Sequence, residues 1–146
     1  MYLLDTDHFS LVTHGNLTVI NRIRVEPPSN VAISLITVEE QLTGWYAQLR
    51  RWSERDKVAR AYTGMFLAIR IIQSIQVLPF PEDVIDLSRS LRIQYRRVGR
   101  MDLSIAAIAL NLNATLVTRN LVDFGQIAGL KIEDWSQPEK GTANHG

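Results

Sequence analysis

Short apolar segments alternate with segments of helical periodicity along most of this 146-residue chain. Five of the apolar segments have the length and composition of strands that are covered on both faces. They are residues 2–4, 31–35, 75–78, 115–117 and 130–132. Strands that alternate with helices are typical of a parallel sheet with a helical connection between successive strands. The sequence therefore predicts an α/β fold, with a central parallel sheet of four or five strands flanked by helices.

Four segments place apolar residues three or four positions apart, which is the spacing of one helix face. They cover residues 37–52, 56–73, 82–97 and 102–110. The last is apolar almost all round, so we expect a buried helix there. The first two predict an αα-hairpin at the domain edge, where large aromatic residues either pack in the core or form a groove for a partner helix or dimer. These aromatic residues are Trp45, Trp52 and Tyr62, and we expect core packing for at least half of them.

The length and the composition, with 46% apolar and 21% charged residues, are those of one globular domain. We expect that domain to cover residues 1–136, and the polar, non-periodic residues 137–146 to form a disordered tail. No apolar run is long enough to span a bilayer, and the acidic N-terminus is unlike a signal peptide. The chain has no cysteine, which excludes disulfides and thiolate chemistry. These features favour a cytoplasmic location.

Acids and amides follow the predicted strands or begin the predicted helices. These residues are Asp5, Asp7, Glu40, Asp102, Asn120 and Asp123. In a parallel sheet such positions gather at the carboxyl edge, where ligands bind. Carboxylates crowded together repel one another and need a shared cation, and oxygen ligands favour Mg²⁺ or Mn²⁺ over zinc. The pattern indicates the metal site of a nuclease or phosphatase.

Each of these acids also has a purely structural interpretation. Residues 37–40 match a capping box, in which Glu40 would only close the helix N-terminus. Asp102 stands where an N-cap residue is expected. Turn and loop positions account equally for Asp5, Asp7, Asn120 and Asp123. Spacing alone does not decide between these interpretations and the metal site.

The three histidines, at positions 8, 14 and 145, do not have the spacing of metal ligands. His8 lies near Asp5, but we interpret it as an ordinary loop or helix residue. The sequence also lacks a Ser–His–acid arrangement, a phosphate-binding P-loop and a dinucleotide-binding glycine pattern. The metal site is therefore the main candidate for chemistry.

Four sequence blocks resemble those of the PIN-domain family and occur in the family's order. They are LLDTD at residues 3–7, ISLITVEEQLTG at 33–44, DLSIAAIAL at 102–110, and LVTRN at 116–120 followed by DF, GL and Trp135. Each block is modest alone, whereas together they extend over residues 2–135. The chain resembles in particular the VapC-type toxins of VapBC toxin–antitoxin pairs.

The resemblance implies a catalytic site that holds Mg²⁺ or Mn²⁺. Its implied ligands are Asp5, Glu40, Asp102 and Asp123. Thr37 and Gly44 set the register that gives Glu40, and not Glu39, the family's acidic position. The fourth position is the least defined, because many members have Asp where this chain has Asn120. Either the Asn120 amide oxygen or the Asp123 carboxylate would fill it.

Supporting hydroxyls are implied at Thr6 and Thr118. Asp7 stands where the family often has Asn, and either adds a carboxylate to the site or has no role in it. Arginine supplies 13 of the 16 basic residues and suits contact with phosphate. Candidate contacts for RNA or an antitoxin are Arg97, Arg100 and Arg119. A solvated helix end is the alternative for the first two, and pairing with a carboxylate is the alternative for Arg119.

The resemblance further implies an endoribonuclease toxin of a type II toxin–antitoxin pair, which forms a homodimer and is inhibited by a small antitoxin. Two other functions remain open from the sequence. One is a degenerate PIN domain that binds RNA or protein without catalysis, which Asn120 in place of an acid would suit. The other is a metal-dependent phosphatase or DNase on a similar sheet.

Overall fold

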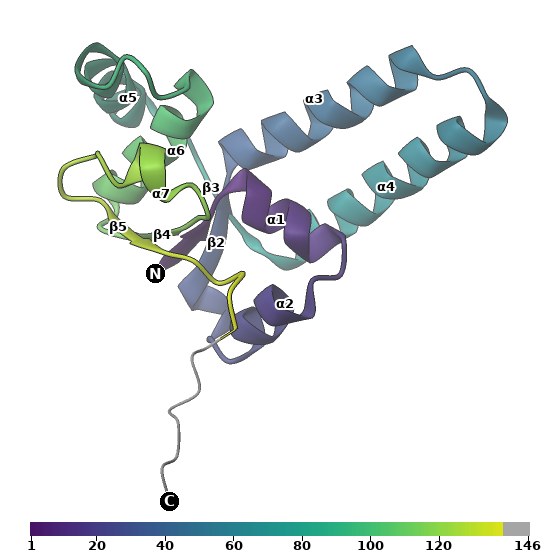
Figure 1. Cartoon of the computed structure of the whole chain (residues 1–146), viewed down its shortest axis with the longest axis horizontal. Coiled ribbons are helices and arrows are strands. Elements are labelled where there is room, and N and C mark those ends of the chain that lie inside the picture. Colours follow the sequence, from purple (N-terminus) through teal and green to yellow (C-terminus); the bar gives the residue numbers. More distant parts are fainter. Residues whose placement is uncertain (139–146) are drawn as a thin grey trace, which may run out of the picture.

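The computed structural model describes residues 1–138, which form one five-stranded parallel sheet with helices on both faces (Figure 1). The strands are β1 (Tyr2–Leu4), β2 (Val31–Ser34), β3 (Gln76–Leu78), β4 (Thr115–Val117) and β5 (Lys131–Glu133). Their order is β3-β2-β1-β4-β5, so β1 is central. The predicted fold class is confirmed. Most of the predicted tail at 137–146, including His145, lies outside the described residues.

Seven α-helices connect or follow these strands within the described residues. They are α1 (Thr6–Thr13), α2 (Leu17–Arg24), α3 (Leu35–Arg51), α4 (Arg55–Ser74), α5 (Glu82–Gln94), α6 (Arg100–Asn111) and α7 (Leu121–Phe124), and a 3₁₀ turn covers Pro28–Asn30. Helices α1, α2 and α7, which are only four to eight residues long, were not predicted from the sequence. In this part of the chain no helix has both the length and the apolar character needed to cross a membrane.

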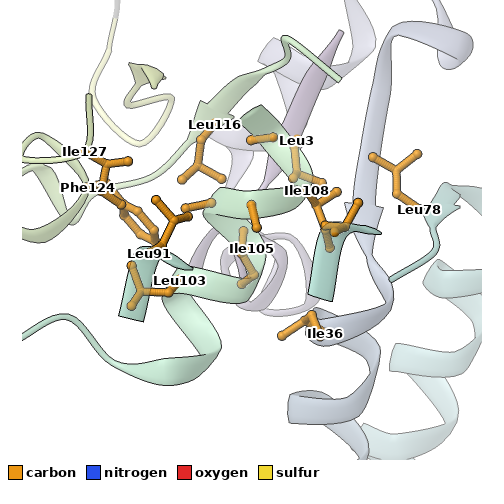
Figure 2. Close-up of a cluster of buried hydrophobic side chains, with 14 of the residues drawn as sticks. Leu3, Ile36, Leu78, Leu91, Leu103, Ile105, Ile108, Leu116, Phe124 and Ile127 are labelled. Carbon is orange, nitrogen blue, oxygen red and sulfur yellow. The ribbon is translucent and has the colours of Figure 1, made fainter. Parts of the chain in front are cut away.

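Successive strand residues pack into two separate core clusters, because side chains alternate between the two faces of a sheet. Leu3 belongs to the cluster that contains the apolar residues of α5, α6 and α7 (Figure 2). Leu4 belongs to the cluster on the other face, which includes Phe9 of α1 and Ala68 of α4. Both faces of the central strand are thus buried, which explains its uninterrupted apolar sequence.

Helix α6 is the most deeply buried helix of the domain, as its sequence predicts. All seven residues from Leu103 to Ala109 are buried. Each large aliphatic side chain removed from water there contributes roughly 1.5–3 kcal/mol to folding. This helix therefore fixes the position of the first-turn residue Asp102 against the sheet.

Helices α3 and α4 form the predicted hairpin, which extends away from the sheet (Figure 1). Trp45 packs against the core, while Trp52 lies outside it, with the Lys57 ammonium 3.8 Å from the ring centroid. Tyr62 is 59% exposed. Of the three aromatic residues only Trp45 packs against the core, so the expectation of core packing for at least half of them is wrong. Tyr62 belongs to α4 of the hairpin, which projects from the sheet, so the core does not cover its side chain (Figure 1). A partner groove on the hairpin stays a prediction.

Candidate functional site

A cavity of about 380 Å³ lies where the first strand and its neighbours end. Its lining residues are Asp5, Thr6, Asp7, Ser10, Glu40, Asp102, Asn120 and Phe124. The structure thus brings together the three acids at positions 5, 40 and 102, as predicted from the edge of a parallel sheet. A larger cavity of about 540 Å³ lies beside Trp135, but Asp134 is the only acid in its lining. We therefore take the acid-lined cavity as the site.

Asp5 connects the central strand to the first helix. Its backbone N–H donates to the carbonyl of Val117 on β4 at 3.0 Å, and its side chain is the N-cap of α1. The Oδ1 atom accepts the backbone N–H of His8 at 2.8 Å. An N-cap carboxylate satisfies an amide that the first helical turn leaves without a partner. Asp5 is only 6% exposed, and the cap fixes one of its oxygens.

The Glu40 side chain is held by a residue of α1 and takes no part in capping its own helix, α3. Helix α3 begins at Leu35 with Ser34 as its N-cap, and the Ser34 hydroxyl accepts the N–H of Thr37 at 3.1 Å. The capping-box interpretation of residues 37–40 is therefore wrong, because the last strand residue already caps the helix. Glu40 lies in the second turn, where its Oε1 accepts the Thr6 hydroxyl at 2.8 Å. The same hydroxyl lies 3.0 Å from that of Thr37.

Asp102 lies in the first turn of α6 and is not its N-cap. The helix begins at Arg100, and Gly99 occupies the cap position without a side-chain hydrogen bond. The N-cap interpretation of Asp102 is therefore wrong, because the helix starts at Arg100, three residues before the apolar run that begins at Leu103. The carboxyl group is consequently not used in capping and lines the cavity.

Burial, and after it the negative charges of Glu40, Asp5 and Asp123, together raise the pKa of Asp102 from 3.8 to about 6. A carboxyl group whose ionisation is opposed by burial and by three like charges lies in an environment that a cation would relieve. The acids are therefore close enough to act on one another. This electrostatic coupling is the property expected of a site that holds a divalent ion.

The fourth block contributes a hydrogen-bonded pair. Asn120 is the N-cap of α7: its Oδ1 accepts the backbone N–H of Asp123 at 3.2 Å, and its Nδ2 donates to Asp123 Oδ2 at 3.0 Å. Asn120 lines the cavity, whereas Asp123 acts on the site through its charge on Asp102. Thr118 is fully buried and accepts the backbone N–H of Asn120 at 2.9 Å, so its hydroxyl supports this turn.

Arg119 is paired with a carboxylate, which was one of its two predicted roles. Its Nε and Nη2 donate to the two oxygens of Asp7 at 2.7 and 2.6 Å. Asp7 thereby has a definite partner at the mouth of the site. Arg97 and Arg100 are exposed and do not line the cavity. Contact of these three arginines with RNA stays a prediction.

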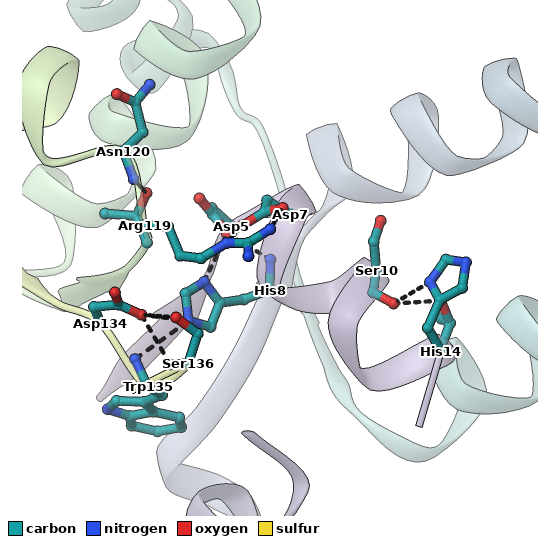
Figure 3. Close-up of polar contacts among 12 residues, drawn as sticks. Asp5, Asp7, His8, Ser10, His14, Arg119, Asn120, Asp134, Trp135 and Ser136 are labelled. Atoms are coloured by element: carbon teal, nitrogen blue, oxygen red, sulfur yellow. Dashed lines mark hydrogen bonds and ion pairs between the residues drawn. The ribbon is translucent and has the colours of Figure 1, made fainter. Parts of the chain in front are cut away.

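The interpretation of His8 as an ordinary residue is wrong. Its ring is completely buried, and Nδ1 lies 3.2 Å from Asp5 Oδ1 (Figure 3). Nε2 accepts the backbone N–H of Trp135 at 3.2 Å. Candidate ligand atoms of Asp5, Asp7 and His8 lie within 4.8 Å of one another. The spacing of Asp5 and His8 placed both on one helical turn, but nothing local to the sequence indicated the contact with Trp135.

A buried parallel sheet with an acid-lined cavity at its carboxyl edge defines an α/β protein with a candidate metal site. A family model described as PIN domain matches residues 2–130, and the chain belongs to this family.

Several known proteins are similar to this chain over nearly its full length. Ribonuclease VapC1 of Haemophilus influenzae is 27% identical over 144 residues, covering 94% of this chain and 99% of the relative. Among solved structures, DNA-bound VapBC from Salmonella typhimurium has a TM-score of 0.77 at 25% identity and covers 92% of this chain and 97% of its own. VapBC-1 from nontypeable Haemophilus influenzae has a TM-score of 0.71 at 26% identity, with coverages of 93% and 98%.

Proposed function

We propose that this protein is a metal-dependent endoribonuclease that acts as the toxin of a type II toxin–antitoxin pair. The observation that carries the proposal is the convergence of Asp5, Glu40 and Asp102 on one cavity, where burial and the charges of the other two acids oppose the ionisation of Asp102. The relative named Ribonuclease VapC1, which matches nearly the whole chain, supports ribonuclease activity. The similar structures solved as VapBC assemblies support a cognate antitoxin.

The donor set fits a hard divalent cation. The acids and the Asn120 amide that line the cavity offer oxygen, the ligand type that Mg²⁺ and Mn²⁺ prefer. His8 is an unsuitable ligand, since both of its ring nitrogens are already engaged by protein groups. When bound, such a cation neutralises the carboxylates, orients a phosphate oxygen and favours the ionisation of an attacking water molecule.

The chain's own residues divide into ligands and supports. Asp5 and Asp102 would hold the ion, and Glu40, fixed by Thr6, would complete the shell or position water. Asp123 would support the site, with or without a second ion. The Asn120 oxygen is the less suitable of the two groups for this role, because it already accepts a hydrogen bond from the Asp123 N–H. Thr118 would act through the backbone of this turn.

Further parts of the proposal concern partners and location. The substrate is RNA, with Arg97, Arg100 and Arg119 as contacts for its phosphates or for an antitoxin, because guanidinium groups bind phosphate and carboxylate in two-point geometry. The protein would act as a homodimer in the cytoplasm. A size measurement in solution, alone and with the product of a neighbouring small reading frame, tests the assembly.

The direct test compares RNA cleavage by the wild-type protein, Asp5→Asn and Asp102→Asn with Mg²⁺ or Mn²⁺ present. We expect both variants to remain folded and to lose cleavage, because each loses a charged ligand. A folded variant that cleaves at the wild-type rate would contradict the assignment. Parallel assays with DNA and a small phosphomonoester distinguish a ribonuclease from a DNase or phosphatase. A wild-type protein that binds no metal would indicate a non-catalytic domain.

A further inference from the structure

His8 is fully buried between the metal-site acid Asp5 and the segment that follows β5. Among the described residues, His8 is the only histidine whose ring contacts a carboxylate of the acid-lined cavity, and that carboxylate belongs to Asp5. Its other ring nitrogen contacts a backbone group 127 positions later in the chain. A buried imidazole with a defined partner on each side has a fixed orientation, and so does any group hydrogen-bonded to it.

The partners determine which ring nitrogen carries the proton. The backbone N–H of Trp135 can only donate, so Nε2 accepts this hydrogen bond at 3.2 Å and is unprotonated. In the neutral ring the proton is then on Nδ1, which donates to Asp5 Oδ1 at 3.2 Å. His8 thus donates toward the acid and accepts from the C-terminal segment.

Asp134 is the other charged group near this ring, with Oδ1 3.5 Å from Nε2. That oxygen already accepts the backbone N–H and the hydroxyl of Ser136, at 2.8 and 2.6 Å. Two short hydrogen bonds satisfy the carboxylate without a proton from the ring. Asp134 therefore holds the turn that presents the Trp135 N–H, as Figure 3 shows.

The Trp135 end of this connection is itself firmly packed. The indole is 4% exposed, its Nε1 donates to Glu133 at 2.9 Å, and its ring lies 4.9 Å from that of Tyr2 on β1. The Arg22 guanidinium stacks 4.6 Å from the Trp135 ring. The backbone N–H that His8 accepts is consequently held in place from three elements.

On this basis we infer that His8 is a positioning residue, which orients the Asp5 carboxylate for metal binding and fixes it to the segment after β5. The inference rests on the proposed function. Oδ1 of Asp5 accepts both the backbone N–H and the ring Nδ1–H of His8, so the carboxylate is held at one oxygen. Within the described residues Oδ2 has no hydrogen bond, and it is the oxygen available to a cation. Loss of such supporting hydrogen bonds typically lowers metal affinity or activity about 10–100-fold.

Two substitutions at His8 test its contact with Asp5 and its contact with Trp135 separately. In His8→Asn the side-chain amide replaces Nδ1 and still donates to Asp5, while the contact with Trp135 is lost. In His8→Gln the amide oxygen replaces Nε2 and still accepts the Trp135 N–H, while the contact with Asp5 is lost. Both variants keep the backbone hydrogen bond to Asp5, and both replace a buried ring by a smaller polar group. A role in packing alone would affect the two variants alike.

The test is a calorimetric titration of the full-length wild-type protein and both variants with Mn²⁺, together with thermal unfolding of the metal-free proteins. We expect His8→Gln to weaken Mn²⁺ binding about 10–100-fold, and His8→Asn to bind close to wild type even though both unfold at lower temperature. Equal affinity in all three proteins, or equal weakening in both variants, would overturn the inference. A wild-type protein that binds no Mn²⁺ would instead overturn the proposed function.

A measurement on the unmodified protein covers the case in which a variant does not fold. Nitrogen-15 NMR of histidine-labelled wild-type protein reports which nitrogen of the buried ring is protonated, with and without Mg²⁺. We expect a neutral ring with its proton on Nδ1 in both states. A proton on Nε2 would remove the donor to Asp5 and overturn the inference.

Discussion

The carboxylate of Asp7 and the guanidinium of Arg119 form a two-point ion pair between residues 112 positions apart, with N–O distances of 2.6 and 2.7 Å. Hydrogen bonding from Arg119 lowers the pKa of Asp7, so the pair is ionised at neutral pH. Both side chains stay about half exposed at the mouth of the site. The pair thus holds the Arg119 guanidinium in a fixed orientation beside the acids of the cavity, and the proposed function would bring an RNA phosphate to this point.

Replacing Arg119 should weaken RNA binding more than it slows the chemical step. For Arg119→Gln we expect a higher KM for RNA, a kcat near wild type, and a salt dependence of binding whose slope falls by about 1. The matched control is Arg60→Gln on the hairpin, which also removes an exposed arginine–aspartate pair. Steady-state cleavage at several salt concentrations measures all three quantities. Equal effects of the two substitutions would refute a phosphate contact at Arg119.

The Thr6 hydroxyl should matter for activity through Glu40. Thr6→Val keeps the shape of the side chain but removes the 2.8 Å hydrogen bond to Glu40 and the contact with Thr37. We expect kcat/KM to fall about 10–100-fold, as for other supporting hydrogen bonds around metal ligands. Thr6→Ser retains the hydroxyl and serves as the control, with activity near wild type. Unchanged cleavage by Thr6→Val would show that Glu40 needs no such support.

Asp102→Asn should stabilise the metal-free protein at neutral pH. The folded state raises the pKa of Asp102 from 3.8 to about 6, so it binds a proton more readily than the unfolded state does. The stability that comes from this tighter proton binding is fully present at pH values below 3.8, and it is lost as the pH rises through about 6. The full difference between the two pKa values corresponds to about 3 kcal/mol in the free energy of unfolding. Because the group is partly exposed, we expect a gain on the order of 1 kcal/mol at pH values above about 6.

Denaturant unfolding of the wild-type protein and Asp102→Asn from about pH 4 to about pH 8 checks this expectation. The advantage of the variant should grow through the interval between the two pKa values and then level off. Saturating Mn²⁺ should reverse the order, since only the wild-type protein gains full binding energy. A constant difference at all pH values would contradict the electrostatic origin of the effect.

The two glycines of the helical hairpin should respond to alanine in opposite directions. A Cβ at Gly64 would overlap the Trp45 ring, whereas a Cβ at Gly44 meets nothing within 4 Å. Gly44→Ala should stabilise the protein by roughly 0.5–1 kcal/mol through helix propensity. Gly64→Ala should destabilise it by about 1–3 kcal/mol and shift the tryptophan fluorescence. Thermal unfolding measures both changes, and stabilisation by Gly64→Ala would show that the hairpin relaxes freely.

The sequence was informative wherever the apolar pattern of a segment is itself the physical cause of its burial. The central strand and helix α6 are buried on all sides, so their composition already specified their place. The acids at positions 5, 40 and 102 could be predicted to meet, because parallel strands bring their carboxyl ends to one edge. Local composition was less informative for α1 and α2, which are eight residues long and bury only His8 and Phe9 in α1 and Val19 in α2.

The helix starts and the role of His8 could not be read from local pattern. Ser34 belongs to a strand by composition and caps α3 only because the chain turns there. Gly99 precedes α6 without a capping side chain, so the helix start carried no sequence signal. The contact of His8 with Trp135 joins the first helix to the segment after the last strand, and only the assembled sheet creates it.

The central claim is that separate carboxylates share one divalent cation, and anomalous diffraction from crystals grown with Mn²⁺ tests it most directly. We expect an anomalous peak in the acid-lined cavity, within about 2.3 Å of oxygens from both Asp5 and Asp102. That peak should be lost in Asp102→Asn crystals. Full-occupancy manganese found only elsewhere, or no bound manganese at saturating Mn²⁺, would contradict a cation shared by these carboxylates.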